Sequence, residues 1–525
     1  MAVFELVIGL LFVGALLSAW ARRLSAPYPA LLALAGAALA LLPSAPSVTL
    51  DPQLALTLFV APVLLDAAFD SSPRDLKENW RAVTGLALVA VGLTVAAVAV
   101  VARWVVPQLP WSAAIALGAI VAPPDAAAAT AVLRQVRPPH RVLVIIEGES
   151  LFNDASALLV YRLAVAAALT GSFSGWRALP TLALVTAGSI LLGAVLSRAT
   201  LFLASRVEDV ATSVIVQFLS TFAVWMVAER LGLSGIITMV VFAILVARTS
   251  PARMPARLRI PSYAVWEVVV FVLNVLAFIL VGLQLKPILQ RLDRPQLIGY
   301  LVTAAAVSAA VILVRFAWVM GYAVAGRWRR GGSSEQPRPA RSPPLRSAVV
   351  IAWCGMRGIV TLAAALALPP EFPYRDLVLF TAFGVVLGTL VLQGGTLSPL
   401  MRALALEDDG AVDGEVRLAR AETARAALDA VSGAGAEELT LLLRRKYEAR
   451  LRHAERVAAH SHASGGDGAP EYTSYTSVLR LALATERRVL LELRARGVIG
   501  DDAFHRVEEE LDWAELNTET MARRE

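Results

Sequence analysis

Long apolar stretches alternate with short polar connections from the N-terminus to about residue 404. A run of about 20 apolar residues crosses the hydrocarbon core of a bilayer as a helix, and all but the short ninth stretch approach that length. The pattern predicts about thirteen spans, at residues 2–20, 27–43, 54–70, 83–106, 111–133, 142–168, 179–204, 210–228, 234–247, 262–284, 298–325, 347–368 and 376–401. Beyond these spans, apolar positions recur at helical spacing among many Arg and Glu residues. We therefore predict a transmembrane domain at 1–404 and a helical tail at 405–525.

The composition favours a polytopic membrane protein. Hydrophobic residues make up 57% of the chain, and the mean hydropathy is +0.64. The first span has no basic region before it, so we expect an uncleaved helix rather than a signal peptide. Cys354 is the only cysteine, which excludes a disulfide within the chain. The tail carries no catalytic motif that we recognise, and we expect neither an enzyme nor a cofactor.

The sixth predicted span carries several polar residues in its middle. An ionised group at mid-membrane costs at least about 2.5–3.5 kcal/mol, so a chain that retains several such groups is expected to use them. Glu147, Ser150 and Asp154 are spaced i, i+3 and i+7 and share one helix face. Glu149 and Asn153 share a neighbouring face. Oxygen ligands of this kind suit a hard monovalent cation or a proton.

The fifth predicted span is interrupted by Pro123 and Pro124, which directly precede Asp125. Proline removes a backbone donor and disfavours helical geometry in the residue before it, so the carbonyls of Ile120 and Val121 lose their helical partners. Such carbonyls are tolerated at membrane depth only where they face protein or a wet cavity. We predict a discontinuous helix here. Asp125 either caps its second half or also binds an ion.

The twelfth predicted span places Arg357 between Gly355 and Gly358, which permit close approach or unwinding. A buried arginine needs a carboxylate partner, and Glu149 of the sixth span is the expected one. The alternative is that the arginine extends to an interface. Broken helices in two halves of a chain are typical of inverted-repeat transporters. The predicted fold is therefore an all-α polytopic membrane protein with inverted repeats and discontinuous helices.

Other polar residues in the spans have open roles. Asp66 lies deep in the third span, unless that span ends early and leaves it at the interface. In the tenth span, Glu267 and Asn274 share a face, and such an Asn more often joins helices than binds a ligand. Arg162 and Arg315 are compatible with either a buried or an interfacial position.

Basic residues concentrate in alternate connections, for example Arg74, Lys77 and Arg81 between the third and fourth spans. Basic loops remain on the cytoplasmic side. With an odd number of spans, this rule places the N-terminus outside the cell membrane and the tail in the cytoplasm. A pI of about 9.7 would suggest nucleic-acid binding in a soluble protein. Topology explains the basic excess here, and we expect no nucleic-acid partner.

Three stretches, at 118–133, 147–162 and 353–369, resemble the bacterial NhaP-type and animal NHE-type Na+/H+ exchangers of the cation/proton antiporter-1 family. The resemblance extends over about residues 5–404. Its most specific parts are Glu-Ser-Leu-Phe-Asn-Asp at 149–154 and Gly-Met-Arg-Gly at 355–358. It implies exchange of Na+, Li+ or K+ for H+ without a cofactor, by a homodimer in the bilayer.

The resemblance also implies roles for individual residues. Asp154 is the acid that binds the cation or the proton, and Ser150 supplies an oxygen ligand to Na+. Asn153 is the structural partner of that acid. Glu149 pairs with Arg357 and holds the sixth span against the twelfth.

Two further acids match family positions, and some residues depart from the pattern. Asp125 stands at the Asp of the fifth-span motif, and Asp66 stands where the family often has Glu. Pro124 replaces a usual Thr, so only its backbone oxygen remains. Cys354 replaces a common Gly. These departures bear on ion selectivity.

A carboxylate in a low-dielectric cavity is stable only when a proton or a cation neutralises it. Competition for Asp154 then gives exchange, provided that only the neutralised site crosses the membrane. The neighbouring residue is Asn153 rather than a second Asp, which predicts one H+ per Na+ and an electroneutral cycle. The alternatives are a K+/H+ exchanger, a non-transporting membrane sensor, and an intramembrane hydrolase with Asp66 and Asp154 as a dyad.

Overall fold

The computed structural model describes residues 2–23, 27–43, 51–136, 138–171, 175–254, 256–290, 294–328, 344–406 and 408–410, with single positions between 412 and 514. Contacts divide the chain into two units, Met1–Ala411 and Val412–Glu525. In the second unit, described positions such as Arg425 and Glu448 are helical. Most of the predicted tail lies outside the described residues.

All regular elements in the described part of the first unit are helices, and the predicted all-α polytopic fold is confirmed. The elements are α1 (Ala2–Arg23), α2 (Tyr28–Ala40), α3 (Pro52–Ala55), η1 (Leu56–Val60), α4 (Ala61–Asp70), α5 (Pro73–Thr84), η2 (Gly85–Ala90), α6 (Val91–Val105), α7 (Trp111–Val121), α8 (Ala126–Val136), α9 (His140–Thr170), α10 (Gly175–Ala204), α11 (Val210–Arg230), α12 (Gly235–Arg253), α13 (Ala256–Leu283), α14 (Leu285–Leu289), α15 (Arg294–Trp328), α16 (Leu345–Trp353), α17 (Ile359–Leu366), α18 (Arg375–Thr389), η3 (Leu390–Gly394) and α19 (Gly395–Leu404). The three η elements are single π-helical segments within longer helices.

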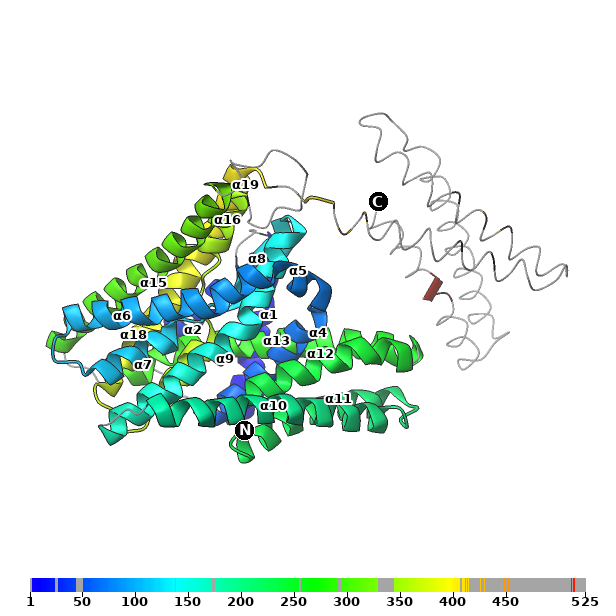
Figure 1. Ribbon diagram of the computed structural model, residues 1–525, viewed down its shortest axis with the longest axis horizontal. Helices are drawn as coiled ribbons and strands as arrows, with labels where there is room; N and C mark the ends of the chain where they lie inside the picture. Colours follow the sequence, from blue (N-terminus) through cyan, green and yellow to red (C-terminus); the bar gives the residue numbers. More distant parts are fainter. Residues whose placement is uncertain are drawn as a thin grey trace. The chain divides into compact units, whose positions relative to one another are not determined.

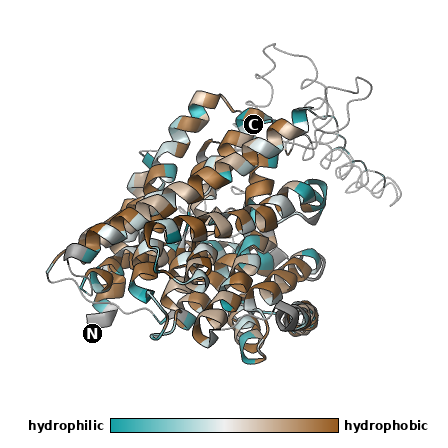
Figure 2. Ribbon diagram, turned by 60° about the vertical axis from the view of Figure 1, so that its left-hand side comes forward, coloured by the Kyte–Doolittle hydropathy of each residue, from teal (hydrophilic) through white to brown (hydrophobic). Residues whose placement is uncertain are grey.

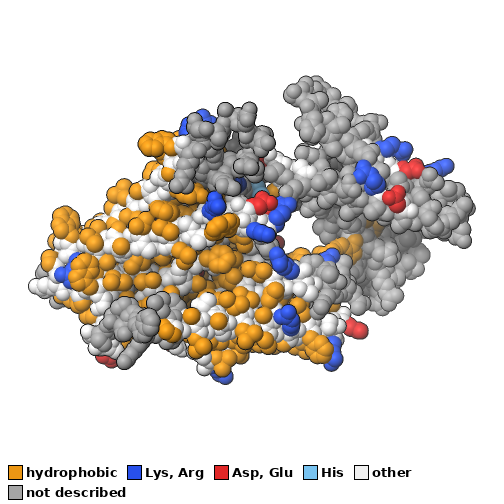
Figure 3. All heavy atoms as spheres, in the orientation of Figure 1, with side chains coloured by type: hydrophobic (Ala, Val, Ile, Leu, Met, Phe, Trp, Pro, Cys, Tyr) orange, Lys and Arg blue, Asp and Glu red, His pale blue; other side chains and the backbone are white. Residues whose placement is uncertain are grey.

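In the described residues, 8 helices are long and apolar enough to cross a membrane. Shorter apolar helices occupy the first, second, third and ninth predicted spans, and α16 with α17 occupies the twelfth. Hydrophobic residues run along most of the helices (Figure 2) and cover most of the described face drawn in Figure 3. Apolar side chains such as Trp104 (82% exposed) and Leu184 (74% exposed) point outward. Such side chains suit a hydrocarbon solvent.

The fourth span begins earlier than the apolar pattern predicts. Arg74, Lys77 and Arg81 lie on helix α5 and not in a loop. The helix starts where Pro73 provides a favourable first residue and the Ser72 hydroxyl accepts a hydrogen bond from the Asp75 amide at 3.3 Å. Helix α5 is amphipathic, and the charged residues on its polar face interrupt the apolar pattern, so the pattern placed the start of the span too late.

The helices of the first unit pack as two bundles. Bundle A contains α1–α4 and α10–α14, with α2 against α13 and α12 against α10, α11 and α4. Bundle B contains α5–α9 and α15–α19, with α7 against α6 and α9, and α15 against α6, α16 and α18. Figure 1 shows α10, α11 and α12 side by side in bundle A and α6, α7 and α9 in bundle B.

Bundle B takes three successive spans from each half of the chain. The first run is α5–α9 and the second is α15–α19. In both runs the middle span is broken, between α7 and α8 and between α16 and α17. This arrangement is the one expected from the predicted repeats and discontinuous helices.

Candidate cation and proton site

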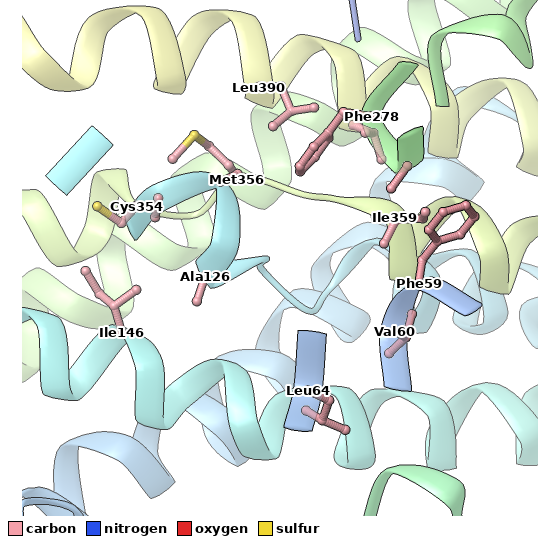
Figure 4. Packing of buried hydrophobic residues seen from close by; sticks show 14 of the residues in the cluster. Phe59, Val60, Leu64, Ala126, Ile146, Phe278, Cys354, Met356, Ile359 and Leu390 are labelled. Atoms are coloured by element: carbon pink, nitrogen blue, oxygen red, sulfur yellow. The ribbon is translucent and has the colours of Figure 1, made fainter. Parts of the chain in front are cut away.

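The two helix breaks of bundle B meet each other. The Asp125 amide, at the α7–α8 break, donates a hydrogen bond to the Met356 carbonyl, at the α16–α17 break, with a distance of 2.7 Å. A Cβ atom at Gly358 would overlap the Asp125 carboxylate. Only a glycine therefore allows these segments to approach so closely. Figure 4 shows that Ala126, Ile146, Met356 and Ile359, all apolar, surround this meeting point.

Asp125 caps helix α8, as one of its two predicted roles requires. Its Oδ1 atom accepts a hydrogen bond from the Ala127 amide at 2.9 Å. The negative charge lies at the positive end of the helix dipole, which stabilises it. Helix α7 ends at Val121 and α8 begins at Ala126, with the buried Pro123 and Pro124 between them, so the predicted break is present at the predicted place.

Helix α9 presents its polar residues to the same break. The Ser150 hydroxyl oxygen accepts from the Ala126 amide at 3.4 Å, and the Asn153 side-chain amide donates to the Pro124 carbonyl at 3.0 Å. Asp154 is buried, with 7% of its surface exposed, and its carboxylate is subject to electrostatic repulsion from Asp125. Five of the predicted site residues therefore lie at or beside this break: Ser150, Asn153, Asp154, Pro124 and Asp125.

The site keeps oxygen atoms available for a ligand. Among the described residues, the Asn153 Oδ1 atom is buried without a hydrogen-bond partner. The buried Asp154 carboxylate and the half-buried Asp125 carboxylate repel each other, so a proton or a cation is needed to neutralise them. The arrangement can therefore bind a monovalent cation or a proton through oxygen ligands.

Arg357 contacts backbone carbonyls, and the predicted pair between Arg357 and Glu149 is wrong. The Arg357 guanidinium is fully buried and donates to the carbonyls of Val121 at 2.9 Å, Ala122 at 3.0 Å and Gly355. These carbonyls belong to the two helix breaks. The arginine therefore satisfies the acceptors that the broken helices leave without helical partners.

The partner of Glu149 is Arg315 of helix α15. Arg315 Nη2 donates to Glu149 Oε2 at 2.7 Å, and Arg315 Nη1 donates to Glu149 Oε1. Both side chains are buried, and the Arg315 guanidinium also donates to the Ile351 carbonyl at 3.0 Å. The pair joins α9 to α15 and α16 within bundle B. The position of Arg315 well inside the apolar stretch Gln296–Trp328 was the available sequence signal for a buried arginine.

The remaining candidates differ in burial and in the helix that carries them. Asp66 is half-buried on α4, which packs against α9, and its role in ion binding stays a prediction. On α13, Glu267 is exposed and Asn274 is half-buried. Arg162 is exposed on α9 and pairs with Glu229 of α11 at 3.3 Å. These last three residues are not assigned to the site.

Comparisons with known proteins agree with this architecture. The family model described as "Sodium/hydrogen exchanger, transmembrane" matches residues 8–403. The "Sodium, potassium, lithium and rubidium/H(+) antiporter" of Bacillus pumilus (strain SAFR-032) is 32% identical over 456 residues, which cover 82% of this chain and 66% of the relative. The "Uncharacterized Na(+)/H(+) exchanger Rv2287" of Mycobacterium tuberculosis (strain ATCC 25618 / H37Rv) is 30% identical over 534 residues, covering 97% of this chain and 96% of the relative.

A solved structure shares the fold. The sodium proton antiporter MjNhaP1 from Methanocaldococcus jannaschii at pH 8 matches with a TM-score of 0.60 and 19% identity, covering 75% of this chain and 99% of that chain. At this level of identity, the likeness concerns the arrangement of the helices.

Proposed function

Because the chain belongs to the sodium/hydrogen exchanger family, we propose that it exchanges Na+ for H+ across the membrane, with Asp154 as the shared binding group. The observation that supports this proposal most directly is the burial of Asp154 beside Asp125 where two broken helices meet. Among the described residues, no arginine or lysine pairs with Asp154, and a buried carboxylate of this kind retains its charge only while it holds a cation. Otherwise it takes a proton.

The other site residues have supporting roles in this proposal. Ser150 and the Pro124 carbonyl are neutral oxygen ligands, and Asp125 contributes charge while it caps α8. Asn153 holds the α7–α8 break through its amide nitrogen and leaves its oxygen for the ion. Asp66 reaches the ion from α4. Transport is alternating access, in which bundle B moves against bundle A with the site attached.

The cycle is electroneutral in this proposal. Asn153 adjoins Asp154, so one carboxylate at this pair of positions exchanges one proton for one Na+. The protein resides in the cell membrane as a homodimer, with its tail in the cytoplasm, and maintains the pH of the cell. No cofactor takes part.

A broader cation range is the second candidate. The Bacillus pumilus relative is named for sodium, potassium, lithium and rubidium. Pro124 has no side-chain oxygen, so only its backbone carbonyl can bind a cation. That carbonyl already accepts a hydrogen bond from the Asn153 side chain. A site with few fixed neutral ligands discriminates less sharply between cations of different size.

The test is reconstitution of the full chain in vesicles with a pH-sensitive dye inside. Proton movement on addition of Na+, unchanged when the membrane potential is clamped, is the expected result. Proton movement on addition of K+ but not of Na+ would identify K+ as the substrate in place of Na+. Absence of movement with any alkali cation would contradict the proposal.

Two variants locate the exchange at the predicted carboxylate. Asp154→Asn keeps the side-chain size and removes the charge, so exchange is expected to disappear while the protein elutes as a folded species in gel filtration. Glu267→Gln removes an exposed carboxylate from a span of bundle A and is the matched control, which should exchange like the wild type. Normal transport by Asp154→Asn would refute the site.

A further inference from the structure

A cavity of about 530 Å³ lies between the two bundles, away from the helix breaks. Its walls come from α5, η2 and α9 of bundle B and from α10 and α12 of bundle A. Most of the lining is apolar, with Val83, Leu88, Phe152, Leu159 and Ile237 among the contributing residues. The volume falls within the range of small-molecule sites, about 300–1,000 Å³.

One end of the cavity is basic and aromatic. Lys77 and Trp80 of α5 line it there, and both side chains are exposed. Arg81, also exposed, lies over the Trp80 ring at 5.5 Å. Helix α5 begins a candidate membrane span, Arg74–Val105, so this end of the cavity lies at a membrane boundary. Trp is enriched at the level of lipid headgroups, and Trp and Lys are both among the residues that anchor a span there.

The other charges on α5 leave Lys77 as the cation that faces the cavity. Arg74 is paired with Asp75 at 2.9 Å, and Asp75 also accepts from His140 at 3.3 Å. Glu78 is exposed on the same helix but is absent from the cavity lining. Lys77 is the one charged residue among the described residues that line the cavity, so the lining carries a positive charge.

We propose that this cavity binds one acyl chain of an anionic phospholipid, with Lys77 contacting the phosphate of the headgroup. An apolar cavity beside a bilayer favours hydrocarbon over water, because water finds too few hydrogen-bond partners on such walls. A basic side chain near a membrane surface attracts anionic lipids. Trp80 stands between the two environments, as an interfacial aromatic residue does.

The position of the cavity gives the bound lipid a consequence for exchange, and this consequence rests on the proposed function. Phe152 and Ser156 line the cavity on the same helix that carries Asn153 and Asp154. A bound acyl chain would therefore touch α9 on one side and α10 and α12 on the other. When bundle B moves against bundle A, it has to displace the acyl chain or carry it along. The rate of exchange would therefore depend on whether the lipid is bound.

Binding is tested without transport. The purified full chain in detergent is titrated with phosphatidylglycerol or phosphatidylcholine of the same acyl chains, and bound lipid is counted by native mass spectrometry. The wild type is expected to prefer phosphatidylglycerol. Lys77→Gln should reduce that preference about fivefold, and Lys77→Arg should retain it. Equal retention of the two lipids by the wild type, or an unchanged preference in Lys77→Gln, would overturn the proposal.

One further variant, with two controls, tests the cavity itself. Thr84→Trp fills the cavity from an exposed wall position and should reduce binding of both lipids. Leu184→Trp adds the same side chain to an exposed position on α10 outside the lining, and Arg206→Gln removes a basic charge elsewhere. Both controls should bind like the wild type. Wild-type binding by Thr84→Trp would exclude the cavity as the site.

These outcomes are separate from those of the proposed function. A protein that binds the lipid but moves no protons would keep the lipid site and refute exchange. A protein that exchanges ions at the same rate in vesicles with and without phosphatidylglycerol would refute only the effect of the lipid on transport.

Discussion

Bundles A and B are held together by different forces. In bundle A, α2 and α13 approach until a Cβ atom at Gly36 would overlap the Ile279 carbonyl, and one at Gly282 would overlap the backbone of Ala37. Small residues at such contacts allow helices in a bilayer to gain van der Waals packing. Bundle B also has a close glycine contact, at Gly118, but it adds buried charges.

Among the described residues, the charged side chains that are buried all lie in bundle B: Asp75, Glu149, Asp154, Arg315 and Arg357. Both broken spans lie in the same bundle. A continuous helix satisfies its own backbone, whereas a broken one needs outside donors for its free carbonyls. In its described residues, bundle A can therefore pack without buried charges. Bundle B needs charges to support its breaks, and the same breaks create the site.

The largest effect is expected from the pair that supports bundle B. Arg315→Leu leaves the Glu149 carboxylate buried without its partner, which should lower the unfolding free energy by about 3–5 kcal/mol. Unfolding in mixed detergent micelles, followed by tryptophan fluorescence, measures this loss. The double variant Glu149→Gln with Arg315→Leu should be more stable than Arg315→Leu alone. Additive losses would show that the two side chains are not coupled.

The close contact in bundle A should respond to volume instead of charge. Gly36→Ala places a Cβ atom against the α13 backbone, which cannot move aside as a flexible side chain could, so the expected loss is about 1–3 kcal/mol. Gly9→Ala on α1 is the control, because no atom lies within 4 Å of the added Cβ. The control should be neutral or slightly stabilising, since Ala favours helices over Gly. The same micelle assay applies, and equal stability of the two variants would contradict close packing at Gly36.

A smaller effect separates the two roles of Asp125. Asp125→Ala removes the cap on α8 and should cost about 1 kcal/mol. Asp125→Asn keeps a capping oxygen and should unfold like the wild type, yet it should change the dependence of exchange on Na+ concentration if the charge also serves the ion. Unfolding and vesicle exchange are measured on the same preparations. Wild-type exchange by Asp125→Asn would assign this residue to capping alone.

The sequence was sufficient for features that depend on local chemistry. Paired prolines predicted the break before Asp125, and the glycines around Arg357 predicted the second break. Apolar length predicted the spans, and Asp154 is buried inside its span as the apolar pattern predicted, whereas its role in exchange stays a prediction. The paired prolines also identified the Val121 carbonyl as an acceptor without a helical partner.

The partners of these groups could not be predicted, because they depend on how distant helices align. Arg357 and Arg315 are both arginines in apolar spans, and nothing local decides which of them faces Glu149. The structure decides through packing: Gly355 leaves room for the Arg315 side chain, whose Cδ atom would lie 2.6 Å from a Cβ at that position. Arg357 is turned instead toward the carbonyls of α7. The start of the fourth span was missed for another reason, since the charged face of α5 interrupts the apolar pattern.

The smallest effect is expected where the two bundles touch through charge. Arg162 of α9 and Glu229 of α11 lie 3.3 Å apart, with side chains 52% and 43% exposed. Water screens such a pair, so Arg162→Gln should lower the unfolding free energy by less than about 1 kcal/mol, and the difference should shrink in high salt. Glu229 is left intact in this variant because it also accepts from the Gly235 amide at 3.3 Å. A weak link is what a moving bundle requires, since a link as strong as the Glu149–Arg315 pair would resist displacement in every cycle. If Arg162→Gln lowered the unfolding free energy as much as Arg315→Leu, charge would hold the two bundles to each other as firmly as it holds the helices of bundle B. The proposed difference between the contacts within bundle B and those between the bundles would then be wrong.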